Sequence, residues 1–349
     1  MAGVLPYLPE VLFSRSARRS ALRVARLMDG ATSRFFGLEC ALGGDPAGRL
    51  GFLACVARTE SAALARVPTP AGADPGAVRT WAALRRFAGE WDGPTGRSLA
   101  AELVNLWLEF DLHAATATRP PSVFLGPREL LGADRGPAVE LLVTRLAGLT
   151  GTVPAPGAHR SLARCLARLP PGAGVFQAGL MRSRTPSPLR LCVTGLRPGH
   201  AVPYAVAAGW PGDAGRAAGL LARVGSQVDR VDVALDLADR VGPTLGLELS
   251  FVPKRRPARE PRWALLVDEL VRTGLCERPV GDALLAYAGH APAPAPSSGG
   301  PPAVLLRGLN HVKLTLRADG TLSAKAYLSV RVLPPVLPLP RPTGPVVTR

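Results

Sequence analysis

Aromatic residues are scarce in this chain of 349 residues, and the common nucleotide-binding and hydrolase motifs are missing. Aromatic side chains make up only 5% of the sequence, so few stacking platforms exist for single-stranded nucleic acid. No GxGxxG follows a predicted strand and no GxxxxGKS/T occurs, so nucleotide-binding folds lack their phosphate loop. Neither GxSxG nor HExxH is present, and the five histidines are isolated. These absences argue against serine hydrolases and metal hydrolases.

Cysteine pairs and long apolar runs are also missing. The five cysteines are far apart, show no CxxC and have no histidine at zinc-site spacing. At the N-terminus the basic residues follow the apolar stretch, which is the reverse of a secretion signal. No apolar run approaches the roughly 20 residues of a membrane-spanning helix. The sequence therefore predicts reduced, buried thiols and a cytoplasmic protein.

Positive charge is abundant, with a formal net charge of +16. The basic residues are scattered and form neither a run nor a known nucleic-acid-reading motif. A small anionic ligand such as a phosphate ester accounts for this charge better than DNA or RNA does. The hydrophobic content of 47% is typical of a globular protein with a core.

The clearest structural signal is a hairpin over Asn310–Arg331. Its two strands are joined by a turn containing Asp319-Gly320, and Asp-Gly is a strong hairpin signal. Side chains alternate between the two faces of a strand. One face is therefore apolar, and the other carries His311, Lys313, Thr315, Arg317, Ser323, Lys325, Tyr327, Ser329 and Arg331.

The same pattern recurs along the chain. Strand pairs are predicted over 34–42 with 49–58, 104–112 with 121–125, 174–183 with 189–196, 231–237 with 244–251, and the final hairpin. Helices are predicted over 20–28, 78–90, 95–103, 137–149, 159–169, 201–208, 213–224, 262–273 and 280–287, and loops over 67–76 and 289–303. The period is about 60 to 70 residues, which indicates an internal repeat.

Ten strands from adjacent hairpins leave two open edges unless the sheet closes. We therefore predict an α+β fold, a ten-stranded antiparallel β-barrel of five units of two helices and two strands. The helices cover the apolar outer face, and the polar faces line the lumen. Residues 1–332 are expected to form this single domain, and 333–349, with six prolines, a disordered tail.

Continuing the alternation gives the side chains of the predicted lumen. They are Phe35, Gly37, Glu39, Asn105, Trp107, Glu109, Asp111, Gln177, Gly179, Met181, Arg190, Cys192, Thr194, Asp232, Asp236, Glu248, Ser250, His311, Lys313, Thr315, Lys325, Tyr327 and Ser329.

In its element order over residues 20–331, the chain resembles the prenyltransferase barrel, the ABBA fold of aromatic, indole and cyanobactin-type peptide prenyltransferases. Lys325 and Tyr327 as Lys-x-Tyr on the last strand, Glu39 on the first strand and further basic lumen residues support the resemblance. Segments 189–196 and 260–276 also resemble uncharacterised bacterial proteins. The resemblance implies transfer of an isoprenoid from an allylic diphosphate to an aromatic or peptide side chain in natural-product biosynthesis.

The resemblance also implies roles for lumen residues. Arg190, Lys313, Lys325 and Tyr327 are the candidates for binding the diphosphate. Glu39 is the candidate base or holder of the nucleophile. Trp107, Glu109 and Glu248 are candidates for shielding the allyl cation and contacting the acceptor. No cofactor is required, although Asp111, Asp232 and Asp236 are candidates for holding Mg²⁺.

Each assignment has a structural alternative. For Lys313 and Lys325 it is cross-strand pairing with Asp or Glu on a solvated face. For the three glutamates it is a structural ion network with Arg190 and the lysines, and for Trp107 it is a place in the core. At the level of function, the alternatives are a non-catalytic barrel that binds a peptide or small hydrophobic ligand, and a scaffold with an open sheet. The carboxylates of the lumen also suit a cationic co-substrate, such as an amine or guanidinium.

Overall fold

The structure is a computed structural model of the chain. It describes residues 1, 3–32, 35–43, 50–93, 102–112, 119–129, 131, 136–151, 156–182, 188–252, 260–293 and 303–333. Predictions for the turn at 44–46, for most of the helix at 95–103 and for the tail beyond 333 fall outside these residues.

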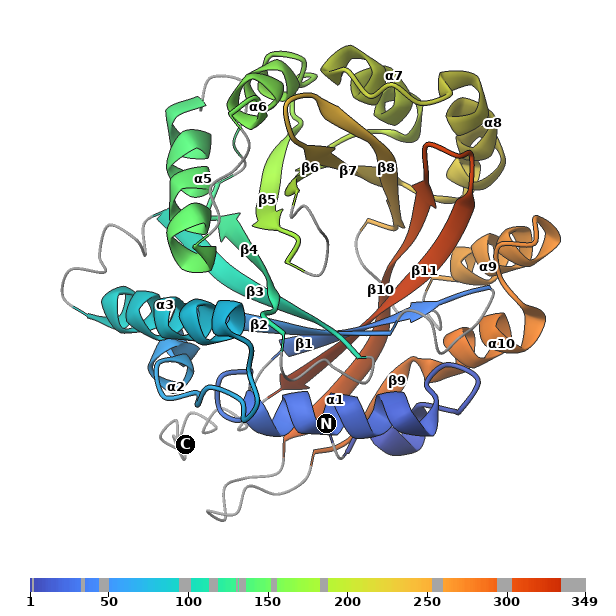
Figure 1. The fold of residues 1–349 in the computed structure, drawn as a ribbon. Helices are drawn as coiled ribbons and strands as arrows, with labels where there is room; N and C mark the ends of the chain where they lie inside the picture. Colours follow the sequence, from blue (N-terminus) through green and yellow to red (C-terminus); the bar gives the residue numbers. More distant parts are fainter. Residues whose placement is uncertain are drawn as a thin grey trace, which may run out of the picture.

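A closed, antiparallel β-barrel forms the centre of the molecule (Figure 1). The described residues form strands β1 (Phe35–Ala41), β2 (Gly51–Ala57), β3 (Leu103–Asp111), β4 (Ser122–Pro127), β5 (Gly174–Leu180), β6 (Leu189–Thr194), β7 (Arg230–Leu237), β8 (Val241–Ser250), β9 (Gly289–Pro292), β10 (Val304–Leu316) and β11 (Leu322–Leu333). Strands β1 to β8 pair in sequence order, β8 pairs with β10, and β10 with β11. Strand β11 then pairs with β1 and closes the ring. The predicted ten-stranded barrel is confirmed, and the open-sheet alternative is wrong.

The last hairpin is longer than predicted. Strand β10 begins at Val304, and the short strand β9 pairs with its first residues outside the ring. The predicted loop over 289–303 is therefore wrong at its start. The alternation rule missed the beginning of β10 because Val304, Leu305 and Leu306 are consecutive apolar residues with no polar face.

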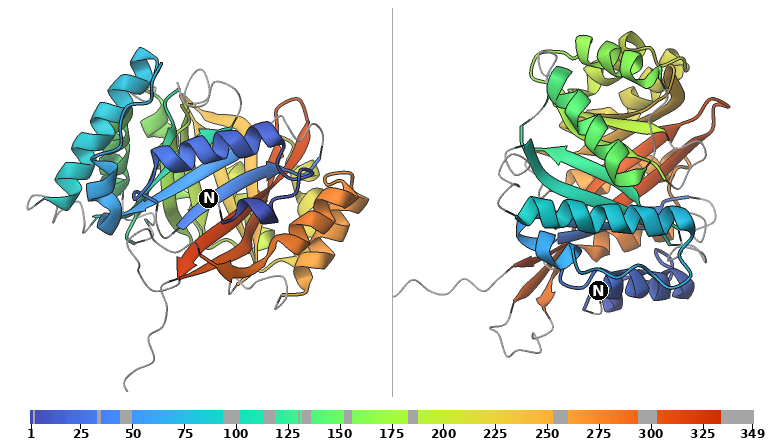
Figure 2. Two further views of the ribbon diagram at one scale, coloured as in Figure 1. Left: turned by 90° about the horizontal axis from the view of Figure 1, so that it is seen from below. Right: turned by 60° about the vertical axis from the view of Figure 1, so that its left-hand side comes forward.

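Helices surround the barrel, as Figure 1 and Figure 2 show. The described residues form α1 (Arg15–Leu27), α2 (Ser61–Leu64), α3 (Pro75–Asp92), α5 (Gly136–Thr150), α6 (Ala158–Ala167), α7 (Pro198–Ala208), α8 (Ala214–Val224), α9 (Arg262–Arg272) and α10 (Arg278–Tyr287), with 3-10 turns η1 (Leu5–Tyr7), η2 (Arg58–Glu60) and η5 (Gly225–Gln227). Two α-helices precede each of the last four hairpins. Before the first hairpin, the described α-helix is α1, which starts five residues earlier than predicted because Ser14 caps it, its Oγ accepting from the Ala17 N–H.

The hydrophobic core lies between the barrel and the helices. Leu38, Val312 and Leu314 point outward from their strands and are fully or almost fully buried. Trp81, on α3, packs its ring against Phe110. Each such side chain contributes about 1.5–3 kcal/mol through burial. Because this core is outside the barrel, the inner face is left for polar residues.

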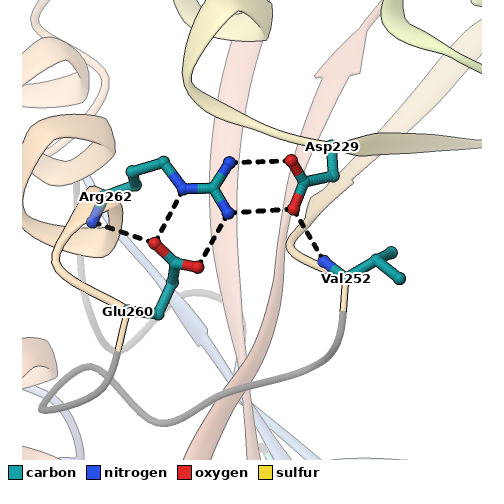
Figure 3. Close-up of polar contacts among 4 residues, drawn as sticks. All are labelled: Asp229, Val252, Glu260 and Arg262. Atoms are coloured by element: carbon teal, nitrogen blue, oxygen red, sulfur yellow. Dashed lines mark hydrogen bonds and ion pairs between the residues drawn. The ribbon is translucent and has the colours of Figure 1, made fainter.

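A bridge of charged residues holds α9 to one end of the barrel (Figure 3). The Arg262 guanidinium donates to both oxygens of Asp229, at 2.7 and 3.0 Å, and to both oxygens of Glu260. Asp229 also accepts from the Val252 N–H, just after β8. Hydrogen bonds from Arg262 lower the pKa of Asp229 and of Glu260. The guanidinium is 37% exposed, so the bridge fixes a geometry more than it adds stability.

In the described part of the chain, none of the helices combines the length and the apolar character that a membrane span requires.

Candidate functional site

The barrel encloses one large cavity, which we call the lumen, of about 730 Å³. Its lining residues include Phe35, Gly37, Glu39, Leu53, Asn105, Trp107, Glu109, Asp111, Ser122, Phe124, Phe176, Gln177, Met181, Arg190, Cys192, Thr194, Arg230, Asp232, Ala234, Thr244, Gly246, Glu248, Asn310, His311, Lys313, Thr315, Arg317, Lys325, Tyr327 and Arg331.

The final hairpin brings two lysines together. Lys313 and Lys325 lie directly opposite each other on β10 and β11, where like charges repel. Each is compensated from the strand on its other side. Lys313 Nζ donates to Glu248 Oε1 of β8 at 2.9 Å, and Lys325 Nζ donates to Glu39 of β1. The repulsion between the lysines is therefore balanced by two carboxylates.

Glu39 ionises more readily than an ordinary glutamate. Burial disfavours its charge, but Lys325 and a hydrogen bond from the Tyr327 hydroxyl outweigh burial and lower its pKa. Tyr327 stays neutral, because burial and the surrounding glutamates raise its pKa. Its ring stacks on His311, with centroids 4.2 Å apart, and His311 Nε2 lies 3.5 Å from Glu248 Oε2.

A second group of ion pairs lies on β6 and β7. Arg190 donates to both oxygens of Asp236, at 2.8 and 3.0 Å. Asp232 accepts from the Thr194 hydroxyl at 2.6 Å and pairs with Arg230 at 3.0 Å. Burial disfavours the charge of Arg190, but Asp236 raises its pKa overall. Both oxygens of Asp236 and the Oδ1 of Asp232 are thus engaged by protein groups.

A magnesium site on the three predicted aspartates stays a prediction. Among the described residues, no three His, Cys, Asp or Glu side chains gather closely enough to hold a metal ion. Asp111 lies on β3, away from the strand that carries Asp232 and Asp236.

Glu109 differs from the other lumen carboxylates. Within the described part of the chain it has neither an ion pair nor a hydrogen bond from another side chain, although it lines the lumen. Burial and the negative charge of Glu39 raise its pKa to about 7, despite the opposing effect of Arg190, Lys313 and Lys325. Glu39 and Glu109 face one cavity with their pKa values shifted in opposite directions, a pattern that separates acid and base roles in active sites.

Aromatic and apolar side chains cover another part of the lumen wall. Trp107 and Phe35 meet edge to face, with ring centroids 5.4 Å apart. A separate apolar cluster inside the barrel contains Phe124, Met181, Cys192 and Ala234, with Phe176 and Trp107 packed against it. Arg331 stacks over Phe35 at 5.1 Å. The lumen thus combines a charged wall with an aromatic wall.

Glycines on the inner face make room for these side chains. A methyl group on Gly246 would lie 2.7 Å from the Lys313 Cε, so Lys313 passes directly over this glycine. A methyl group on Gly179 would overlap the Phe124 ring. Both glycines lie within strands, where glycine often indicates close approach of another group.

All the candidate residues meet at this cavity. Arg190, Lys313, Lys325, Tyr327, Glu39, Trp107, Glu109 and Glu248 line the lumen. Lys313 is only 7% exposed, so it does not lie on a solvated face, but the cross-strand pairing with a glutamate that the alternative predicted is present. Trp107 lies in the lumen and not in the outer core. The predicted ion network is present for Glu39 and Glu248 and, as far as the described residues go, absent for Glu109.

The lumen prediction also contained errors. Gly179, Asp236, Ser250 and Ser329 do not appear in the lining, whereas several residues that do line it were missed. The missed residues include Leu53, Ser122, Phe124, Phe176, Arg230, Ala234, Thr244, Gly246 and Asn310. Strand β2 is apolar on both faces, and Ser122 is the only polar residue of β4, so alternation could not identify their inner residues. Between Val175 and Gln177 the register shifts, which lets the adjacent Phe176 and Gln177 both reach the lumen.

The barrel, with two helices before each of the later hairpins, has the architecture of the prenyltransferase barrel. No family model matches the chain, and no curated protein matches it. Among solved structures, it is similar to 5-dimethylallyl tryptophan synthase from Streptomyces coelicolor, in complex with DMASPP and Trp. That match has 17% identity and a TM-score of 0.48, and covers 97% of this chain and 96% of the other. It is also similar to AnaPT from Neosartorya fischeri, at 13% identity and a TM-score of 0.45, over 85% of this chain and 77% of the other.

Proposed function

We propose that the protein is a prenyltransferase that moves an isoprenoid from an allylic diphosphate to an aromatic or peptide side-chain acceptor in natural-product biosynthesis. The observation that carries this proposal is the lumen itself, which brings a cationic wall and an aromatic wall into one cavity of about 730 Å³. Prenyl transfer needs both, because an anion must leave while a carbocation is kept from water.

The diphosphate is assigned to the charged wall. Lys313, Lys325, Arg190 and Tyr327 supply the donors, as the resemblance implies. The two lysines are bound to carboxylates by single contacts, and their flexible ammonium groups can turn toward phosphate oxygens. Arg190 is held in a bidentate pair and adds a fixed positive charge. These donors stabilise the negative charge that grows on the leaving diphosphate.

The isoprenoid and the acceptor are assigned to the aromatic wall. The faces of Trp107, Phe35 and Phe124 stabilise positive charge by cation–π interaction. Glu39, held as a carboxylate by Lys325 and Tyr327, orients the nucleophile of the acceptor. Because Asp236 is engaged through both oxygens and Asp232 through its Oδ1, the proposal assigns charge neutralisation to protein cations and includes no cofactor.

The proposal places the enzyme in the cytoplasm. The five cysteines are all buried and unpaired, which suits a reducing compartment.

A non-catalytic barrel that binds a peptide or small hydrophobic ligand is the second candidate. The ion pairs favour it, because Lys325, Lys313 and Arg190 already have carboxylate partners. A diphosphate must compete with these carboxylates for the three cations, whereas an apolar ligand does not need the cations.

Titration calorimetry with dimethylallyl, geranyl and farnesyl diphosphates tests the proposal, together with an assay for diphosphate release in the presence of aromatic and peptide acceptors. We expect binding and acceptor-dependent release by the wild-type protein. Binding should be abolished in Lys313→Ala with Lys325→Ala, and kept in the control Arg26→Ala with Arg223→Ala, which removes two charges from exposed positions on α1 and α8.

Because the lysine variant leaves two glutamates without partners, Lys325→Gln with Glu39→Gln is tested beside it. This second variant removes one pair without leaving an isolated charge. Unchanged affinity in both variants would remove the diphosphate assignment. Binding of a prenyl alcohol without binding of any diphosphate would favour the second candidate.

A further inference from the structure

Glu109 is the one glutamate of the lumen without a charged partner in the described part of the chain. Glu39 pairs with Lys325 and Glu248 with Lys313. A carboxyl group inside a protein is ordinarily paired or hydrogen-bonded. Among the described residues, Glu109 therefore offers the lumen a carboxyl group that no charged protein side chain has claimed.

The surroundings of Glu109 indicate what kind of group that is. Trp107 lies two residues away on the same inner face of β3, and Phe124 is the cross-strand partner of Trp107. Phe35 meets Trp107 edge to face. Directly opposite Glu109 are Leu53 on β2 and Ser122 on β4, neither of which is charged. A carboxyl group beside aromatic rings suits an organic cation, which gains both an ion pair and cation–π contact.

We infer that Glu109, with the rings of Trp107, Phe35 and Phe124, binds a positively charged organic group of the acceptor, an amine or guanidinium. The inference rests on the proposed function in assigning that group to the acceptor. It narrows the acceptor class from aromatic or peptide side chains in general to those that carry a cation.

The charge balance of the lumen supports this assignment. The charged and titratable groups whose electrostatic effect reaches Glu109 are Glu39 on β1, Arg190 on β6, Lys313 on β10, and Lys325 and Tyr327 on β11. Asp111 lies two residues along on β3. The basic members of this set already have acidic partners. A bound diphosphate adds negative charge to this balanced set, and a cation at Glu109 offsets it.

Cation binding has a thermodynamic signature at this site. Because the pKa of Glu109 is about 7, about half of the protein molecules carry its proton at pH 7. An arriving cation favours the carboxylate and releases that proton. Binding at pH 7 should therefore release about half a proton per ligand, and binding at pH 9 almost none.

The experiment compares N-acetyl-arginine amide with N-acetyl-citrulline amide, which has nearly the same shape and no charge. Calorimetry of the full chain in PIPES and in HEPES, whose ionisation enthalpies differ and which contain neither phosphate nor a primary amine, measures affinity and released protons. We expect the arginine ligand to bind at least tenfold more tightly and to release the proton. Glu109→Gln should lose both effects, and Glu90→Gln, an exposed control on α3, should keep both.

Equal affinity for the two ligands, or an arginine preference that survives Glu109→Gln, would overturn the inference. If Glu109→Gln does not fold, Glu109→Asp takes its place and should keep a weaker preference for the arginine ligand. Equal affinity of Glu109→Asp for the arginine and citrulline ligands would count against the site. Dimethylallyl diphosphate is titrated into the same samples. Diphosphate binding without an arginine preference overturns this inference alone, and an arginine preference without diphosphate binding supports it while overturning prenyl transfer.

Discussion

Replacing the Glu109 carboxyl by an amide should change how the stability of the barrel depends on pH. Burial and Glu39 raise the pKa of Glu109 from 4.5 to about 7 in the folded protein. Below pH 4.5 the carboxyl group is protonated in both the folded and the unfolded chain, so it does not lower the free energy of unfolding. As the pH rises from 4.5 through 7, ionisation increasingly favours the unfolded chain. Above pH 7 the carboxyl group is ionised in both states, and the loss of folding stability reaches its full size.

The magnitude follows from the shift. A change of about 2.5 pKa units, at 1.36 kcal/mol per unit, destabilises the folded protein by about 3 kcal/mol above pH 7. Glu109→Gln removes the titration and keeps a side chain of similar shape. We therefore expect the variant to gain about 3 kcal/mol over the wild type at pH 8.5, and little of this at pH 4.5.

Urea unfolding, followed by tryptophan fluorescence across this pH range, measures the difference between the two proteins. Glu90→Gln is the control, because the exposed Glu90 lies on an outer helix. Stability curves of wild type and Glu109→Gln that run parallel from pH 4.5 to 8.5 would refute the reasoning. A difference in unfolding free energy between the two proteins that grows as the pH falls would refute it as well.

Two further substitutions test the packing of the lumen. Lys325→Met should destabilise the protein by about 3–5 kcal/mol at pH 7, because it leaves the buried Glu39 without its cation. Adding Glu39→Gln should recover most of the loss in urea unfolding, and a double variant as unstable as the single one would contradict the pairing. Gly179→Ala should cost about 1–3 kcal/mol, because the new methyl group overlaps the Phe124 ring. Gly199→Ala, on α7 with open space around it, should leave the free energy of unfolding nearly unchanged. An equal loss of stability in the two variants would argue against overlap of the new methyl group with the Phe124 ring.

Strand alternation was sufficient to predict the barrel and much of its lining. Around Glu39, Trp107 and Lys325 each strand has a polar face and an apolar face, so its inner residues can be identified without knowing its neighbours. Closure was favoured because an open sheet of ten strands would leave two edges unpaired. The ring pairing between β11 and β1 confirms that step.

The sequence could not reveal which charges pair. Lys313 meets Glu248 from 65 residues away, and the register between their strands decides the partner. Glu109 has the same residue type and the same alternation as Glu39, and only the three-dimensional arrangement leaves it without a cation. Strands such as β2, with apolar residues on both faces, contain no signal that distinguishes inside from outside. Phe176 was missed for a different reason, because a register shift cannot be predicted from alternation.

The closure of the ring by β11 also sets the order in which the lumen can come into existence. Lys325 is 286 residues away from Glu39 in the chain, so the ribosome makes the carboxylate long before its partner. Until β11 is in place, β1 has an unpaired edge that is open to association with other chains. Contacts between such distant segments also slow folding. The cavity therefore cannot assemble progressively during synthesis, and every function that depends on it begins only after the final hairpin has docked.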